Sequence, residues 1–62
     1  MLLKLRGKRV EKGYTQKQFA EKLNISLPSY RLKEVGKIEF RMNEINLILK
    51  LLDCKYEDIF LQ

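Results

Sequence analysis

The side chains of this 62-residue sequence that could do chemistry are dominated by cations, because the chain has 13 lysines and arginines and no histidine. Histidine is the commonest general base and the commonest metal ligand. The single thiol, Cys54, cannot form an intramolecular disulfide or a multi-cysteine metal site. We interpret it as a small buried hydrophobe in a reducing compartment. We therefore expect no enzyme, no metal site and no cofactor.

The positive charge is concentrated in the first two thirds of the chain. Residues 1–41 carry eleven basic and four acidic side chains, a net charge of +7, whereas residues 42–62 carry two and four, a net charge of −2. A polyanion such as a nucleic acid would dock on the basic part. An ordinary solvated surface explains the charge equally well. The helices that position these side chains therefore have to be identified before the two interpretations can be compared.

A first helix is predicted over residues 3–12, in which Leu5 and Val10 share one inward face with Leu2 or Leu3. Gly13 follows a lysine-bearing end and is a typical helix stop. Glycine inside a helix costs up to about 1 kcal/mol relative to alanine. We therefore interpret Gly7, in the middle of this helix, as the mark of a close packing contact.

A second helix begins at Thr15, because Thr15 and Gln18 have the spacing of a capping box. It is expected to end near Leu23, and Asn24 suits the left-handed conformation that a tight turn needs. The small and apolar residues at helical spacing predict its inward face: Phe19, Ala20 and Leu23.

Three further helices follow, and we predict no strand. Ser26 caps the third helix, which Gly36 ends. Residues 37–41 form a loop, and helices are expected over residues 42–52 and 56–60. The inward residues expected in these two helices are Met42, Ile45, Ile48, Leu52, Ile59 and Phe60.

Two short helices joined by a tight turn in a basic chain form a helix-turn-helix pattern, here from Gln16 to Lys33. The motif needs a small residue where its helices touch, and Ala20 supplies it. It also needs an inward anchor on the second helix, and Tyr30 supplies that. The motif alone is of moderate specificity, because many helical proteins contain such a match by chance.

The run KRVEKGYTQKQFAEKLNIS resembles the first half of the phage repressor and Cro-type domain, the XRE family, whose pattern is R-x-x-x-G-x-T-Q-x-x-[LF]-A-x-x-x-x-[IV]-S. Downstream, SYRLKEVGKIEF resembles one branch of that family, and DCKYEDIF resembles its closing helix. The resemblance covers nearly the whole chain without gaps. It implies an all-α, compact five-helix, lambda-repressor-like DNA-binding domain over residues 1–62, with the helix-turn-helix at about 16–35.

The resemblance further implies that the third helix enters the major groove of DNA. The residues expected to face the bases are Leu27, Pro28, Ser29, Arg31 and Leu32. Arg31 suits guanine O6 and N7, and apolar side chains pack on thymine methyl groups. The alternative for Leu27 and Leu32 is the core or a dimer surface.

Phosphate contacts are expected from Gln16, Lys37 and Arg41. The resemblance also implies a buried ion pair between Arg9 and Glu34, and the alternative is two unrelated surface charges.

Two departures from the family pattern concern the helix-turn-helix. Asn24 stands where glycine is usual, and Lys33 stands where an apolar residue is usual. Either the Lys33 stem lies along the edge of the core with its charge in water, or the third helix is slightly rotated.

These expectations together describe a Cro-like or small repressor of bacterial or phage origin, which binds a double-stranded DNA operator as a homodimer in the cytoplasm, at the nucleoid. A dimer surface is expected at Leu47, Leu51 and Leu61. No signal peptide, membrane span, small-molecule ligand or C-terminal sensor domain is expected. The alternative is a helix-turn-helix fold used as a protein-interaction module, such as an antirepressor or antitoxin.

Overall fold

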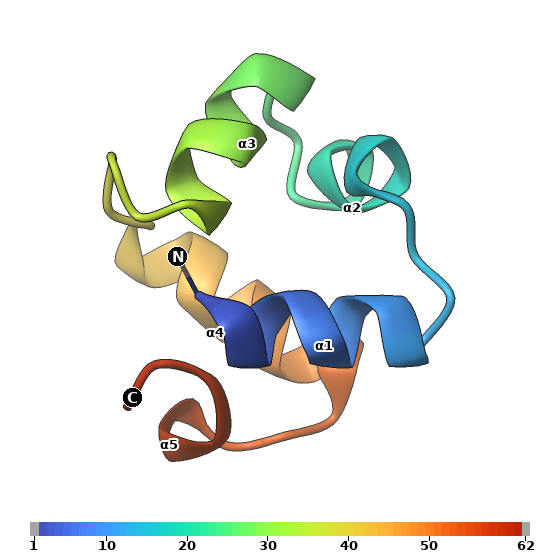
Figure 1. The fold of residues 1–62 in the computed structure, drawn as a ribbon, viewed down its shortest axis with the longest axis vertical. Coiled ribbons are helices and arrows are strands. Elements are labelled where there is room, and N and C mark those ends of the chain that lie inside the picture. Colours follow the sequence, from blue (N-terminus) through green and yellow to red (C-terminus); the bar gives the residue numbers. More distant parts are fainter. Residues whose placement is uncertain (1, 62) are drawn as a thin grey trace.

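A computed structural model describes residues 2–61, in which five helices and no strand occur. In chain order the helices are α1 (Leu3–Glu11), α2 (Gln16–Lys22), α3 (Leu27–Glu34), α4 (Met42–Leu52) and α5 (Tyr56–Ile59). The expected all-α, five-helix architecture is therefore confirmed, and no helix end differs from its prediction by more than two residues. Figure 1 shows α1 crossing in front of α4, with α2 and α3 above it and α5 below.

The helix ends follow the predicted capping residues. Thr15 Oγ1 accepts the Gln18 N–H at 3.0 Å, and Gln18 Oε1 accepts the Thr15 N–H at 2.9 Å, which completes the capping box of α2. Ser26 Oγ accepts the Ser29 N–H at the start of α3. Gly13, with φ of 85°, follows the end of α1 in the left-handed conformation that glycine adopts without strain.

Helices α4 and α5 are each preceded by a basic capping residue, Arg41 and Lys55, whose side chain cannot accept a backbone hydrogen bond. The acid three residues further on supplies the acceptor instead. Glu44 Oε1 accepts the Arg41 N–H at 2.9 Å, and Asp58 Oδ2 accepts the Lys55 N–H at 2.9 Å. Each helix start is thus held by half of a capping box.

One apolar core joins the five helices, made by Leu5, Phe19, Ala20, Leu23, Tyr30, Ile48, Leu52 and Ile59. Two predicted core positions were wrong, because Val10 is 59% exposed and Met42 is 70% exposed. Val10 lies five residues after Leu5, about 140° around α1, and Met42 lies six before Ile48, about 120° around α4. The residues one turn from those core positions, Arg9 and Glu44, are buried instead.

The interpretation of Gly7 as a close packing contact was also wrong. A Cβ atom added at Gly7 would meet nothing within 4 Å.

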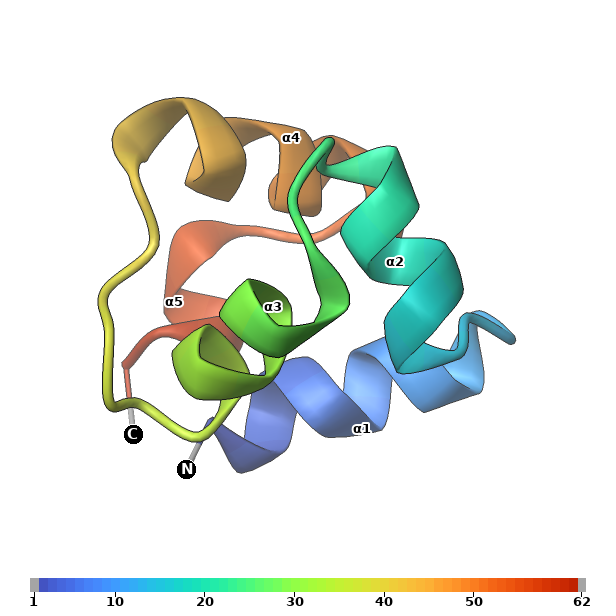
Figure 2. The same ribbon diagram turned by 90° about the horizontal axis from the view of Figure 1, so that it is seen from above.

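Figure 2 shows the two ends of the described chain side by side, where Lys4 Nζ donates to the Leu61 carbonyl at 3.0 Å. Among the described residues, no helix is long and apolar enough to span a membrane.

Candidate nucleic-acid interface

Helices α2 and α3 pack directly on each other across a tight turn (Figures 1 and 2). Ala20 is fully buried, and its carbonyl accepts the Ile25 N–H at 3.0 Å. Asn24 turns the chain with φ of 59°, the left-handed conformation expected of it. The rings of Phe19 and Tyr30 meet edge to face with centroids 5.6 Å apart. These contacts fix the angle between α2 and α3.

The outer face of α3 carries the residues expected to face DNA bases. Pro28 and Arg31 are exposed, and Leu32 is 39% exposed and lies outside the core cluster. Leu27 and Ser29 are half-buried, and the Ser29 hydroxyl accepts a bond from the Ser26 hydroxyl at 2.9 Å. The exposed residues 28, 31, 32 and 35 have the spacing of one helical stripe. Val35, the last of them, was not predicted, although the same spacing identifies it.

Beneath that stripe, the buried Glu34 carboxylate joins three helices. Arg9 Nε donates to Glu34 Oε2 at 3.0 Å, and Arg9 Nη2 donates to Oε1 at 3.3 Å. The Tyr30 hydroxyl also donates to Oε2. Arg9 Nη1 in turn donates to the Tyr14 carbonyl at 2.6 Å, which ties the loop after α1 to the same group. The two residues expected to pair therefore lie together, out of water.

The network changes the acidity of both of its acids. Burial alone would raise the pKa of Glu34, but the hydrogen bonds from Arg9, Tyr30 and Gln16 outweigh it and hold that pKa below its ordinary value. Burial, followed by the hydrogen bond to Glu34, raises the pKa of the Tyr30 hydroxyl far above its ordinary value of 10.0. Glu34 is therefore an anion and Tyr30 a neutral donor at neutral pH.

Gln16, expected at a phosphate, lies half-buried at the start of α2 and connects the buried network to the surface. Its Nε2 donates to Glu34 Oε1 at 3.1 Å. Its Oε1 accepts from Arg31 Nε at 3.3 Å, on the exposed side. The Gln16 amide thus supports the Arg31 guanidinium through Nε, one of its five N–H donors.

Neither alternative expected for Lys33 describes its position. Lys33 is only 8% exposed, and its Nζ donates to Glu44 Oε1 and Oε2 at 2.7 and 2.9 Å. Glu44, 6% exposed, was not predicted to have a role. Its place three residues after Arg41 was a capping signal, but nothing in the sequence spacing links it to Lys33. The pairing holds the pKa of Glu44 below its ordinary value, although burial acts in the opposite direction.

Lys37 and Arg41 are both exposed on the segment between α3 and α4. The Lys37 N–H donates to the Leu32 carbonyl at 2.9 Å, so this cation directly follows the last turn of α3. Both exposed cations thus lie on the segment that follows α3 in the chain.

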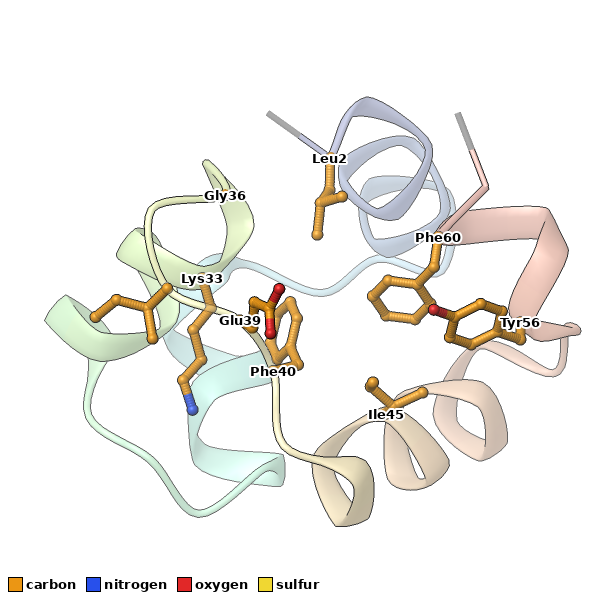
Figure 3. Close-up of a pocket in the computed structure, with 9 residues that line it drawn as sticks. Leu2, Lys33, Gly36, Glu39, Phe40, Ile45, Tyr56 and Phe60 are labelled. Atoms are coloured by element: carbon orange, nitrogen blue, oxygen red, sulfur yellow. The ribbon is translucent and has the colours of Figure 1, made fainter.

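The segment between α3 and α4 also lines a groove of about 310 Å³ (Figure 3). Phe40 from the segment, Ile45 from α4 and Phe60 just after α5 form its apolar walls, and Leu2 closes one side. The described residues contain no cluster of three side chains suited to a metal ion. Cys54 is half-buried as a free thiol, and burial raises its pKa, which makes it a poor nucleophile.

The chain matches a known protein family. A family model described as helix-turn-helix matches residues 5–59, which is most of the chain. No curated protein and no solved structure gave a significant match.

Proposed function

Because the chain belongs to the Cro/C1-type helix-turn-helix family, also called the XRE family, we propose that it is a sequence-specific transcriptional regulator that reads the major groove of DNA with α3. Membership of this family indicates a DNA-binding regulator. The observation that carries the finer proposal is the outer face of α3. It presents Pro28, Arg31 and Leu32 on a helix held rigidly by α2, with the exposed Lys37 and Arg41 beside it.

In this proposal the base contacts come from two kinds of side chain. Arg31 donates to guanine O6 and N7, and its bond to Gln16 limits the positions from which it does so. Leu27, Pro28 and Leu32 pack on thymine methyl groups, and the Ser29 hydroxyl lies at the start of the same face. A largely apolar face predicts a site in which thymine matters more than guanine.

Phosphate contacts hold the helix in register and carry little sequence information. We assign them to Gln16 at the start of α2 and to Lys37 and Arg41 after α3. The Gln16 side chain is already shared between Glu34 and Arg31, so its backbone N–H is the group available to a phosphate. The concentration of positive charge in residues 1–41, the part of the chain that contains Gln16, Lys37 and Arg41, supports this assignment.

We further propose that residues 1–62 act as one domain that binds its operator as a homodimer, in the manner of a Cro-like or small repressor. A single domain reads a short half-site, and two half-sites raise affinity and length of recognition together. Leu47 and Leu61 are exposed, and Leu51 is half-buried, which supports a modest apolar surface for the partner. Such a regulator would act in the cytoplasm of a bacterium, at the nucleoid.

Selection of bound sequences from random duplex DNA tests this proposal. It should return two thymine-containing half-sites whose centres lie about 10 base pairs apart, one turn of B-DNA. A footprint on the selected duplex should protect both half-sites on one face. Recovery of no common sequence, or of a single half-site bound by a monomer with full affinity, would contradict it.

A protein-interaction module is the second candidate, because the outer stripe of α3 includes the apolar Leu32 and Val35. The salt dependence of binding separates the two candidates. DNA binding releases counterions and weakens steeply with salt, whereas an apolar protein contact does not. Substitutions on α3 that leave DNA preference intact but abolish binding to another protein would favour the second candidate.

A further inference from the structure

Lys33 and Glu44 join the end of α3 to the start of α4 by an ion pair that is nearly excluded from water. The Lys33 Nζ reaches both carboxylate oxygens, at 2.7 and 2.9 Å, and the two side chains are 10% and 7% exposed. The pair bridges the segment of residues 35–41, which contains no helix or strand. That segment is the one that carries the exposed Lys37 and Arg41.

The Glu44 carboxylate has a second task. Its Oε1 also accepts the backbone N–H of Arg41 at 2.9 Å, so one side chain binds both α3 and the residue that precedes α4. Lys33 has a second contact as well, because its Nζ lies 5.9 Å from the centroid of the Phe40 ring. Figure 3 shows Lys33 and Phe40 at neighbouring positions along the groove.

Hydrogen bonds hold the two ends of the segment. At its start the N–H groups of Lys37 and Ile38 both donate to the Leu32 carbonyl, at 2.9 and 3.4 Å. At its end the Arg41 N–H donates to Glu44. A buried ion pair is a poor source of stability, because desolvation offsets most of the attraction. Its geometric effect, a fixed distance between α3 and α4, is therefore the better explanation of what it does here.

We propose that the Lys33–Glu44 pair is a positioning device for DNA binding, which fixes the segment 37–41 so that Lys37 and Arg41 meet the phosphates beside the α3 contact. This proposal rests on the proposed function. Lys33 and Glu44 touch no DNA themselves; they act through the backbone that carries the two exposed cations.

The double variant Lys33→Met/Glu44→Leu tests the proposal without changing the net charge of +5. Replacing a buried ion pair by apolar side chains of similar size is often neutral or stabilising, so the variant is expected to fold. Its affinity for random duplex DNA should fall about tenfold, and its salt slope should become shallower by about one to two phosphates' worth, roughly 0.9 each. A folded double variant with the wild-type affinity and slope would overturn the proposal.

A single variant with a matched control keeps the test independent of how well the double variant folds. Glu44→Gln removes the negative charge that pairs with Lys33 but retains a side-chain oxygen that accepts the Arg41 N–H. Glu57→Gln makes the same charge change on an exposed residue of α5. Glu44→Gln should bind random duplex about threefold more weakly than Glu57→Gln, with a shallower slope. Equal affinities and slopes for these two variants would also overturn the proposal.

Amide hydrogen exchange measured without DNA separates this proposal from the proposed function. The Lys37 amide, whose acceptor is the Leu32 carbonyl and is changed in neither variant, should exchange at least about tenfold faster in the variant that folds, Lys33→Met/Glu44→Leu or Glu44→Gln, than in the wild type. Unchanged exchange would refute the positioning role even if the protein binds DNA. If exchange is faster in the variant but the chain binds no duplex DNA, the pair does position the segment and the proposed function is refuted.

Discussion

Glu34 is the residue whose loss should matter most, because its carboxylate accepts hydrogen bonds from three side chains on three helices. Removing one partner of a buried ion pair leaves an unpaired charge out of water, which costs on the order of 3–5 kcal/mol. A domain of 62 residues has a total stability of only about 3–9 kcal/mol. Each member of the pair is therefore close to indispensable for folding while the other remains.

We predict that Arg9→Ala and Glu34→Ala each lower the melting temperature sharply. The double variant should be destabilised by less than the sum of the two, because the second change removes a charge that the first left unpaired. Thermal unfolding followed by circular dichroism measures all three. Single variants that melt at the wild-type temperature would show that the pair contributes nothing.

Base-reading and phosphate-contacting residues should respond differently to substitution. Lys37→Ala should weaken binding to selected and random duplexes equally, because phosphate is the same at every base pair. Leu32→Ala should instead reduce discrimination, by roughly 1–3 kcal/mol at one or two base pairs. Quantitative binding assays with both duplexes measure the two effects.

Replacing thymine by uracil, which lacks only the methyl group, gives the control for Leu32. The wild type should bind the uracil duplex more weakly than the thymine duplex. Leu32→Ala should bind the two duplexes with equal affinity. If Leu32→Ala weakens binding to every sequence equally, Leu32 does not read a base.

Single residues were predictable from sequence where a local rule or the family pattern determines them. The capping box of Thr15 and Gln18, the left-handed Asn24 and the inward Tyr30 depend on neighbours in the chain. The partner of Lys33 was not predictable, because Glu44 lies eleven residues away, and only the packing of α3 against α4 brings the two together. The sequence alone does not indicate which acidic residue neutralises a buried lysine.

At the scale of helices, the ends were predictable and two of the faces were not. All five starts and most of the stops lie within a residue of expectation, and glycine, serine and threonine mark several of these ends by their backbone chemistry. The inward faces of α1 and α4 each include a charged residue, Arg9 and Glu44, where apolar periodicity favours Val10 and Met42. Buried ion pairs break the rule that apolar residues mark the core.

The two ion pairs that join helices should make the fold sensitive to acid. The pKa values of Glu34 and Glu44 are both below the ordinary value in the folded chain. Each pair therefore contributes stability that is fully present above the unfolded carboxyl pKa of about 4.3 and is lost as the pH falls through the lower folded value. We predict a nearly constant melting temperature between pH 7 and about 5, and a steep fall below that range.

Glu44→Gln should flatten this acid response, because its side chain is neutral at every pH. Glu57→Gln, on the exposed face of α5, is the control and should keep the wild-type response. A melting temperature that falls equally in the wild type and in Glu44→Gln between pH 5 and 2 would show that the Lys33–Glu44 pair has no part in it.

At the scale of the whole molecule, positive charge and the outer face of α3 belong to the same part of the chain. The net +7 of residues 1–41 includes Arg31, Lys37 and Arg41, whereas α4 and α5 fall in the region of net −2. This asymmetry favours a polyanion as the partner in the proposed function. Self-association in solution should be weak and should be completed on a duplex that carries two half-sites.

The most direct test of DNA-specific function is the affinity of the wild-type chain for its selected duplex and for a shuffled duplex of the same composition, measured over a series of salt concentrations. We predict that the selected duplex binds at least about 10³-fold more tightly. Both affinities should fall steeply and linearly on logarithmic axes as salt rises. Equal affinity for the two duplexes, or binding that is insensitive to salt, would contradict the conclusion that α3 reads DNA.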